Sequence, residues 1–347
     1  MHKLLAPGTP LRIFAFSIAS TIAILFGVLF GVGPGALLLT VILAVVELTF
    51  SFDNAIINAK VLAKLSKPWQ TAFLSVGIIV AIFGMRIVFP VVIVMITAHL
   101  SWGTVVDLAL HHSHEYAEHL DKAHASIAAF GGAFLLMLGL TFFMSDEKDI
   151  HWIRFIEKPI SKFSHWLAAP AVVVVVLLAI TWLPANVHEH DTIVSGLLGA
   201  GTYILIQTLS HLFTRFQGDR ALQAGQTGLT ALSSLIYLEV LDASFSFDGV
   251  IGAFAITSNV ILIAAGLGIG ALWVRSLTVY MVRKGVLGQY RFIEHGAHYT
   301  VLVLAALMLV SVLVEISDYI PGLLGIGIIG ASIAASLRAN RDNLTTA

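Results

Sequence analysis

The sequence has 347 residues, of which 58% are hydrophobic and only 11% are charged, and its formal net charge is −1. Soluble domains usually carry about a quarter charged residues, so this composition predicts a protein that is embedded in a lipid bilayer. The sequence contains no cysteine, which excludes disulfides, thiolate metal sites and iron–sulfur clusters. A net charge near zero gives no reason to expect nucleic-acid binding.

Apolar runs long enough to cross a bilayer as helices recur along the whole chain. The first, 13–31, follows Lys3 and Arg12 but is too long for the apolar part of a signal peptide, so we interpret it as a retained membrane helix. Further runs lie at 35–62, 71–98, 127–144, 169–183, 193–213, 228–256, 259–282, 300–316 and 323–337. The last is short and rich in small residues, so it is either a full span or a re-entrant segment. The expected fold is an all-α polytopic membrane protein with about ten transmembrane helices.

Basic residues indicate the orientation, because short cytoplasmic loops are enriched in Lys and Arg. With the N-terminus inside, sixteen of the 19 Lys and Arg residues fall in cytoplasmic segments, Lys122 falls outside, and Arg86 and Arg275 fall within spans. We therefore predict a multi-pass protein of the plasma (inner) membrane with both termini in the cytoplasm.

An eight-residue motif occurs twice in the chain. Residues 47–54 read ELTFSFDN in the second predicted span, and residues 242–249 read DASFSFDG in the seventh. Gly77 precedes Arg86 by nine residues, as Gly266 precedes Arg275. The two motif helices lie five crossings apart and therefore run in opposite directions, which is typical of the inverted repeats of secondary transporters. The expected organisation is an extra helix (1–34), a three-helix repeat 1 (35–145), a two-helix connector (146–225), a three-helix repeat 2 (226–318) and a short C-terminal helix with a tail (319–347).

Five carboxylates fall within these apolar segments, where an ionised side chain costs about 2.5 to 3.5 kcal/mol. Two arginines cannot neutralise all five. The surplus predicts a bound cation or transferable protons; the alternative is that the acids pair with the arginines, or stay protonated, and serve packing alone. Oxygen ligands without sulfur suit hard divalent cations such as Mn²⁺, Ca²⁺ or Mg²⁺. The candidate metal ligands are Glu47, Asp53, Asn54, Glu239, Asp242 and Asp248. The supporting polar residues are Thr49, Ser51, Asn58, Ser244 and Ser246, and the counter-charges are Arg86 and Arg275.

Helical geometry predicts a break in both motif helices. Asp53 lies about 120° from Glu47 around a regular helix, so a straight helix cannot direct both carboxylates at one ion. Asp248 lies opposite Glu239 by the same reasoning. We expect both helices to be bent or unwound near the Ser-Phe-Asp step, as in transporters with discontinuous helices. The alternative is a regular helix in which Asp53 and Asp248 meet different partners.

Both motifs resemble those of the TerC integral membrane proteins. The first is similar to the signature Glu-x-x-Leu-Ser-x-Asp-Asn, here Glu47, Phe50, Ser51, Asp53 and Asn54. The second is similar to Glu-x-x-Asp-x-x-Phe-x-x-Asp, here Glu239, Asp242, Phe245 and Asp248. The resemblance implies a member of the LysE transporter superfamily, manganese or calcium efflux, and tellurium resistance. The stretch Gly249-Val250-Ile251-Gly252 replaces the Ser and nearby Pro usual in TerC proteins, so we expect a divergent branch.

A second polar cluster lies in the long outer loop. His111, His114, Glu115 and Glu118 have the spacing of residues on one helical face, which would allow them to bind a metal ion. The alternative is a solvated, pH-responsive loop.

The favoured function is proton-coupled efflux of a divalent cation, Mn²⁺ or Ca²⁺, with the cation as transported ligand, no cofactor and the lipid bilayer as partner. The alternative is a scaffold or sensor that does not transport, in a metal or tellurite stress-response complex. An intramembrane aspartyl protease is disfavoured, since neither aspartate lies in a Gly-x-Gly-Asp motif. We therefore do not expect an enzyme.

Overall fold

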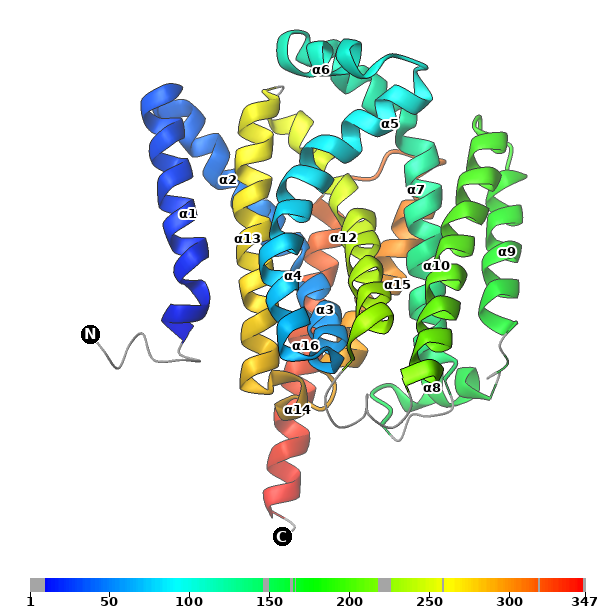
Figure 1. The fold of residues 1–347 in the computed structure, drawn as a ribbon. Helices are drawn as coiled ribbons and strands as arrows, with labels where there is room; N and C mark the ends of the chain where they lie inside the picture. The colour runs from blue at the N-terminus through cyan, green and yellow to red at the C-terminus, as the bar shows by residue number, and fades with distance from the viewer. Residues whose placement is uncertain are drawn as a thin grey trace. The chain divides into compact units, whose positions relative to one another are not determined.

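A computed structural model describes residues 10–145, 150–162, 165, 167–217, 226–257, 259–317 and 319–345. Within these ranges the chain forms helices and no strand, apart from one isolated bridge between Leu65 and Gln226. The predicted all-α fold is therefore confirmed. Figure 1 shows the helices in chain order.

Among the described residues, seven helices are long and apolar enough to cross a membrane, or eight if a bent pair counts as one span. They begin with α1 (Pro10–Gly31), continue with the helix formed by α4 (Lys67–Ile79), η1 (Val80–Val88) and α5 (Phe89–Thr97), and then comprise α7 (Ser113–Phe143), α10 (Glu189–Gln217), α13 (Val260–Lys284), α15 (Ile293–Ser311) and α16 (Tyr319–Thr345). The bent pair is α2 (Pro34–Phe50) with α3 (Phe52–Lys64). The protein is therefore a polytopic membrane protein.

The two other predicted runs also contain helices. These are α9 (Ala168–Thr181), which is shorter than a typical span, and α12 (Gly228–Ile256). The last predicted run lies in α16, whose apolar part, Ile320–Arg341, has 22 residues and is long enough to cross. Short helices α6 (Trp102–His111), α8 (Arg154–Ser161) and α14 (Val286–Gln289) lie in the connections. The exact count of ten spans stays a prediction.

The predicted break is present in the first motif helix. α2 and α3 meet at an angle of 53°, and Ser51 between them has φ −97° and ψ 13°, outside the helical range. The backbone N–H of Ser51 still bonds the carbonyl of Glu47 at 2.9 Å. The bend therefore turns the chain between Glu47 and Asp53 without exposing many backbone groups to an apolar environment.

The predicted break in the second motif helix is wrong. α12 runs from Gly228 to Ile256 as one helix. Gly249 does not interrupt it; a Cβ there would lie 3.0 Å from Oε2 of Glu47. The glycine therefore provides a close approach between helices, and the backbone hydrogen bonds of α12 continue past it.

The chain forms two compact units, which combine segments from the predicted repeats in a different way. Unit 1 comprises Met1–Ala123 and Phe213–Lys284. Its central helix is α13, which packs against α1, α2, α3 and η1 (Figure 1). Ser17 of α1 bonds the carbonyl of Leu272 and the hydroxyl of Ser276, at 2.9 and 2.6 Å. α13 thus packs against both segments that carry the repeated motif, α2–α3 and α12.

Unit 2 comprises His124–Leu212 and Gly285–Ala347. In it α15 packs along α16, and a buried carboxylate fixes the segment that leads into α8. Glu157 accepts hydrogen bonds from the backbone N–H groups of Trp152 and Ile153, at 3.2 and 3.1 Å, and from the hydroxyl of Tyr299 at 3.2 Å. His295 Nε2 lies 3.4 Å from Glu157 Oε2. This carboxylate therefore ties the connection to α15.

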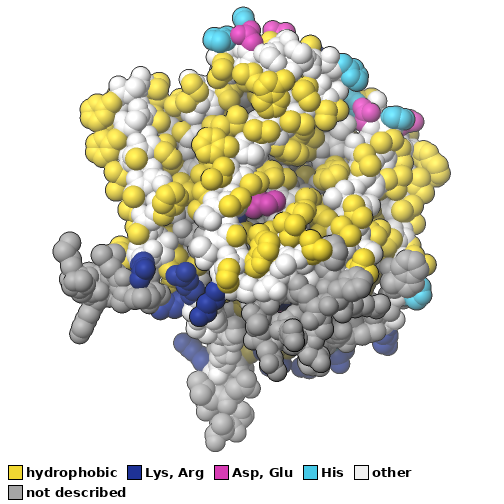
Figure 2. Space-filling view, in the orientation of Figure 1, with side chains coloured by type: hydrophobic (Ala, Val, Ile, Leu, Met, Phe, Trp, Pro, Cys, Tyr) yellow, Lys and Arg dark blue, Asp and Glu magenta, His cyan; other side chains and the backbone are white. Residues whose placement is uncertain are grey.

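The visible surface agrees with a membrane location. Hydrophobic side chains cover most of the described surface in this view (Figure 2). Exposed apolar residues include Phe30, which is 81% exposed. Such a surface is stable in contact with lipid. The sidedness of the termini stays a prediction.

Candidate ion site

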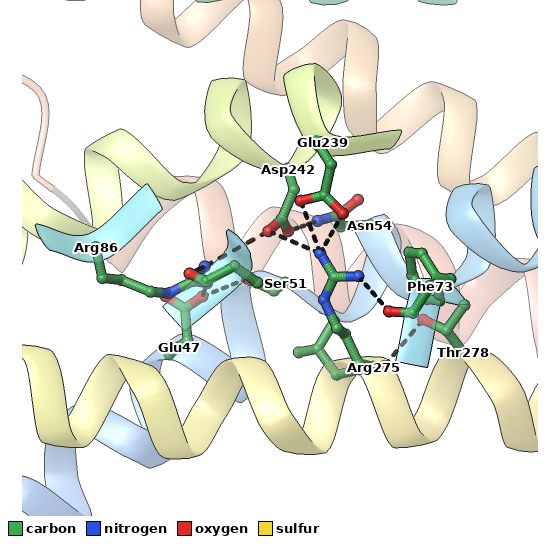
Figure 3. A network of polar contacts seen from close by, with 11 residues as sticks. Glu47, Ser51, Asn54, Phe73, Arg86, Glu239, Asp242, Arg275 and Thr278 are labelled. Atoms are coloured by element: carbon green, nitrogen blue, oxygen red, sulfur yellow. Dashed lines mark hydrogen bonds and ion pairs between the residues drawn. The ribbon is translucent and has the colours of Figure 1, made fainter. Parts of the chain in front are cut away.

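A network of buried charges lies within unit 1 and joins residues of both predicted repeats. α2 and η1 supply Glu47 and Arg86, while α12 and α13 supply Glu239, Asp242 and Arg275 (Figure 3). All five were predicted from the sequence as metal ligands or counter-charges. The structure brings them together as two acid–arginine groups that share one aspartate.

The first group is built on Arg86. One guanidinium nitrogen of Arg86 binds Glu47, and the other donates to the carbonyl of Ala81 at 2.7 Å and reaches Asp242 at 3.5 Å. The side chains of Arg86 and Glu47 are 1% and 2% exposed. Ser51 at the helix break donates its hydroxyl to Glu47 at 3.2 Å. Arg86 lies in the π-helical segment η1, and segments of this kind occur frequently at functional sites.

The second group is built on Arg275. Its Nη2 donates to both carboxylate oxygens of Glu239, at 2.9 and 3.0 Å. Its Nη1 donates to the carbonyl of Phe73 at 3.1 Å, and the guanidinium lies 4.3 Å from the centre of the Phe73 ring. These contacts hold Arg275 on several sides, as Figure 3 shows.

Asp242 is the carboxylate shared by the two groups. Its Oδ2 lies 3.5 Å from Arg86 and 3.9 Å from Arg275, while its Oδ1 accepts a hydrogen bond of 2.8 Å from Asn54 Nδ2. Both ion pairs are longer than a typical charge-assisted hydrogen bond. Asp242 is therefore the acid of the network whose arginine contacts are weakest.

Carboxylates outnumber arginines at this site. Asp53 is 4% exposed and begins α3, where its Oδ1 accepts the backbone N–H of Asn54 at 2.9 Å. Asp53 is the neighbour of Asn54, which bonds Asp242, so unit 1 has four described carboxylates at or next to the network for two guanidinium groups. Oδ1 of Asn54 and Oδ1 of Asn58 are buried without a hydrogen-bond partner. The site thus combines surplus negative charge with oxygens available to a cation.

Two glycines allow this close packing. A Cβ at Gly77 would lie 3.0 Å from Glu239 Oε1 and closer still to the guanidinium of Arg275. A Cβ at Gly270 would overlap the side chain of Glu47. From the sequence, Gly77 was only a marker of the repeat, and neither Gly270 nor the Phe73 and Ala81 carbonyls were predicted as parts of the site. The nine-residue Gly-to-Arg spacing was the one signal for Gly77.

The other predicted residues have different outcomes. Ser51, Asn54 and Asn58 are buried near the helix break, and Thr49 is partly buried in α2. The side chains of Asp248, Ser244 and Ser246 lie outside the described residues. Among the described side chains, no group of three or more His, Asp or Glu is arranged to hold a metal.

The predicted outer cluster consists of exposed local pairs. His111 Nδ1 lies 2.8 Å from Asp107 Oδ1, and His114 Nδ1 lies 3.2 Å from Glu118 Oε1. Each pair joins residues four apart on one helix. This arrangement resembles the solvated loop more than a common metal site, and metal capture there, including by Glu115, stays a prediction.

The fold and this network define a multi-pass membrane protein with a buried carboxylate–arginine centre. The chain belongs to the family described as protein of unknown function (DUF475), whose model matches residues 52–343. The match includes Asp53, Arg86, Asp242 and Arg275, while Glu47 lies just before it. Searches of curated proteins and of solved structures found no match.

Proposed function

We propose that this protein is a secondary transporter that moves a divalent cation, Mn²⁺ or Ca²⁺, out of the cytoplasm in exchange for protons. The observation that carries the proposal is the surplus of buried carboxylates over arginines in unit 1. A buried negative charge without a partner is costly, so the surplus requires a cation or protons. A relationship to the TerC proteins is part of the same proposal.

Asp242 is the ligand that a cation would recruit first. Its contacts with Arg86 and Arg275 are long, and each arginine has a closer partner in Glu47 or Glu239. Asp242 can therefore leave the arginines with little loss of electrostatic free energy. Asp242, Asp53 and the amide oxygen of Asn54 then offer oxygen ligands of the kind that Mn²⁺ and Ca²⁺ prefer.

Counted over the described side chains, which leave Asp248 out, the surplus gives an exchange ratio. The four described acids exceed the two arginines by two charges, which one divalent cation neutralises. When the cation leaves, two protons restore the same balance. The proposal therefore expects one divalent cation to be exchanged for two protons.

A second candidate is a scaffold or sensor that does not transport. It is favoured by the ion pairs of Glu47 and Glu239, which are already satisfied by arginine, and by the lack of a preformed three-ligand group among the described side chains. In that function the network would join α2, α12 and α13 permanently.

Flux measurements separate the two candidates. The purified protein is reconstituted into liposomes with an internal dye for Mn²⁺ or Ca²⁺, with and without a pH gradient. Asp53→Asn and Asp242→Asn are compared with Asp107→Asn, whose side chain is 59% exposed in α6. Ion movement that is lost in the first two variants and retained in the third supports transport. Folded protein that moves neither ion under any gradient refutes it in favour of the scaffold.

A further inference from the structure

Unpartnered oxygens also occur away from the charge network, along two antiparallel helices of unit 1. Asn54 on α3 bonds Asp242 on α12, and Leu65 after α3 pairs with Gln226 before α12. The two helices therefore run in opposite directions from the network to one end of the unit. These two segments carry buried side-chain oxygens without hydrogen-bond partners at Asn54, Asn58, Ser66 and Thr230.

Asn58 is the important member of this set. It lies four residues after Asn54 and therefore on the same face of α3, about 6 Å further from the network. Its side chain is 3% exposed, and Thr230 is fully buried. Buried polar groups are nearly always paired, so several unpaired oxygens on two paired segments indicate that something polar passes between the segments at another stage.

The far end of the line is closed by a clasp between the two segments. Ser66 N–H donates to the carbonyl of Gln226 at 3.1 Å, and Gln226 N–H donates to the carbonyl of Lys64 at 2.9 Å. The side chain of Gln70 donates to the carbonyl of Leu65 at 2.9 Å, and Ser234 donates to Gln226 Oε1 at 2.9 Å. Leu65 is 3% exposed. This clasp lies about 16 Å along α3 from Asn54.

We propose that the contact between α3 and α12 is one half of the cation path, with Asn58 as a transient oxygen ligand between Asp242 and the clasp at Leu65 and Gln226. The inference rests on the proposed function, which it deepens by assigning the route. The predicted topology places this half on the cytoplasmic side. A dehydrating cation needs oxygen ligands along the way, and Asn58 supplies one at the step next to the central site.

The natural absence of cysteine permits a direct test. Asn58→Cys is made alone and together with Gln70→Ala and Gln226→Ala. These substitutions remove the side-chain hydrogen bonds that hold each of the two segments in position for the backbone bonds of the clasp. The control is Ile236→Cys on α12, where the antiparallel pairing gives a similar depth and the apolar residue is 49% exposed. The probe is a cationic, membrane-impermeant methanethiosulfonate, with which the cysteine thiolate forms a mixed disulfide and releases methanesulfinate.

We expect Asn58→Cys to react at least about tenfold faster when the clasp is weakened, because loss of one or two hydrogen bonds shifts an equilibrium by about that factor. Mn²⁺ should slow this reaction. Ile236→Cys should react slowly in both backgrounds, since thiolate does not form in lipid. Thr230→Cys provides a second position if Asn58→Cys does not fold.

An Asn58→Cys rate that is unchanged by the clasp substitutions, in protein that is monodisperse and folded, overturns the proposal. Rates at Asn58→Cys and Ile236→Cys that rise together also overturn it, because they indicate general loosening. The labelling needs no transport. If only the proposed transport is wrong, the clasp substitutions still speed labelling, but no flux is measured and Mn²⁺ does not slow the reaction. If only the proposed route is wrong, flux is measured and Asn58→Cys is not labelled.

Discussion

Removal of Arg86 is the sharpest test of how the charge network contributes to stability. The substitution Arg86→Gln leaves Glu47 and Asp242 without their shared cation. The Arg86 and Glu47 side chains are only 1% and 2% exposed, so water cannot replace the lost partner. Removing one member of a buried ion pair is therefore expected to be far more costly than removing both.

The magnitude follows from the distances. The 3.5 Å separation between Arg86 and Asp242 corresponds to an attraction of about 5 kcal/mol at an effective dielectric constant of about 20. Part of this is offset by desolvation, and measured losses for one partner of a buried pair are about 3 to 5 kcal/mol. We expect Arg86→Gln to lose that much, and the double variant Arg86→Gln with Glu47→Gln to lose less than the two single variants together by about 2 kcal/mol or more.

The assay is reversible unfolding in mixed micelles, titrated with a denaturing detergent, for all four members of the double-mutant cycle. The parallel cycle of Arg275→Gln with Glu239→Gln is the comparison, and its coupling should be smaller because the Glu239 side chain is 16% exposed. If the losses at Arg86 and Glu47 add within about 0.5 kcal/mol, the two residues do not act as a buried pair, and the reasoning fails.

Three further predictions concern other parts of the molecule. Gly77→Ala should lower the free energy of unfolding by about 1 to 3 kcal/mol, because its methyl group displaces the fixed guanidinium of Arg275; Gly27→Ala, with open space around it, should not destabilise, and the same detergent titration compares the two. Asp53→Asn should reduce the number of protons exchanged per cation from two toward one, measured from paired pH and Mn²⁺ dyes; an unchanged ratio would exclude Asp53 as a proton carrier. Glu157→Gln should increase amide hydrogen exchange in residues 150–162, since weaker acceptors then hold two backbone N–H groups, and unaltered exchange there would contradict a fastening role.

The sequence predicted which residues form the charge network, but it did not predict which acid contacts which arginine. A charged residue in an apolar helix costs free energy and therefore indicates a functional role. Glu47, Asp242 and both arginines were predicted on this basis, together with their spacing. Which acid meets which arginine depends on helix rotation and on the separation of helices. Arg86 binds an acid of its own repeat and another of the second repeat, a choice that local sequence does not contain.

The two motif helices show where symmetry reasoning fails. The angular argument between Glu47 and Asp53 correctly predicts the bend at Ser51. The same argument applied to α12 is wrong, because Gly249 is needed for close packing against Glu47 and no break is required. The π-helical segment around Arg86 was also not predicted, since its hydrogen-bond shift leaves no pattern of apolar residues.

From the sequence, the segment around α8 was predicted only as part of the two-helix connector 146–225, with no buried acid. In the structure Glu157 is 1% exposed and bonds a tyrosine 142 residues away in sequence. A glutamate in a polar segment is usually solvated. No local signal distinguishes this one, because its burial depends on α15.

The unequal shapes of α2–α3 and α12 define what a second conformation would be. In a pair of inverted repeats, each half can adopt the form that the other half has, and exchange of the two forms turns the opening from one side of the membrane to the other. If the two predicted repeats of this chain are related in this way, the exchange would straighten residues 34–64 into one helix and bend α12 (Gly228–Ile256).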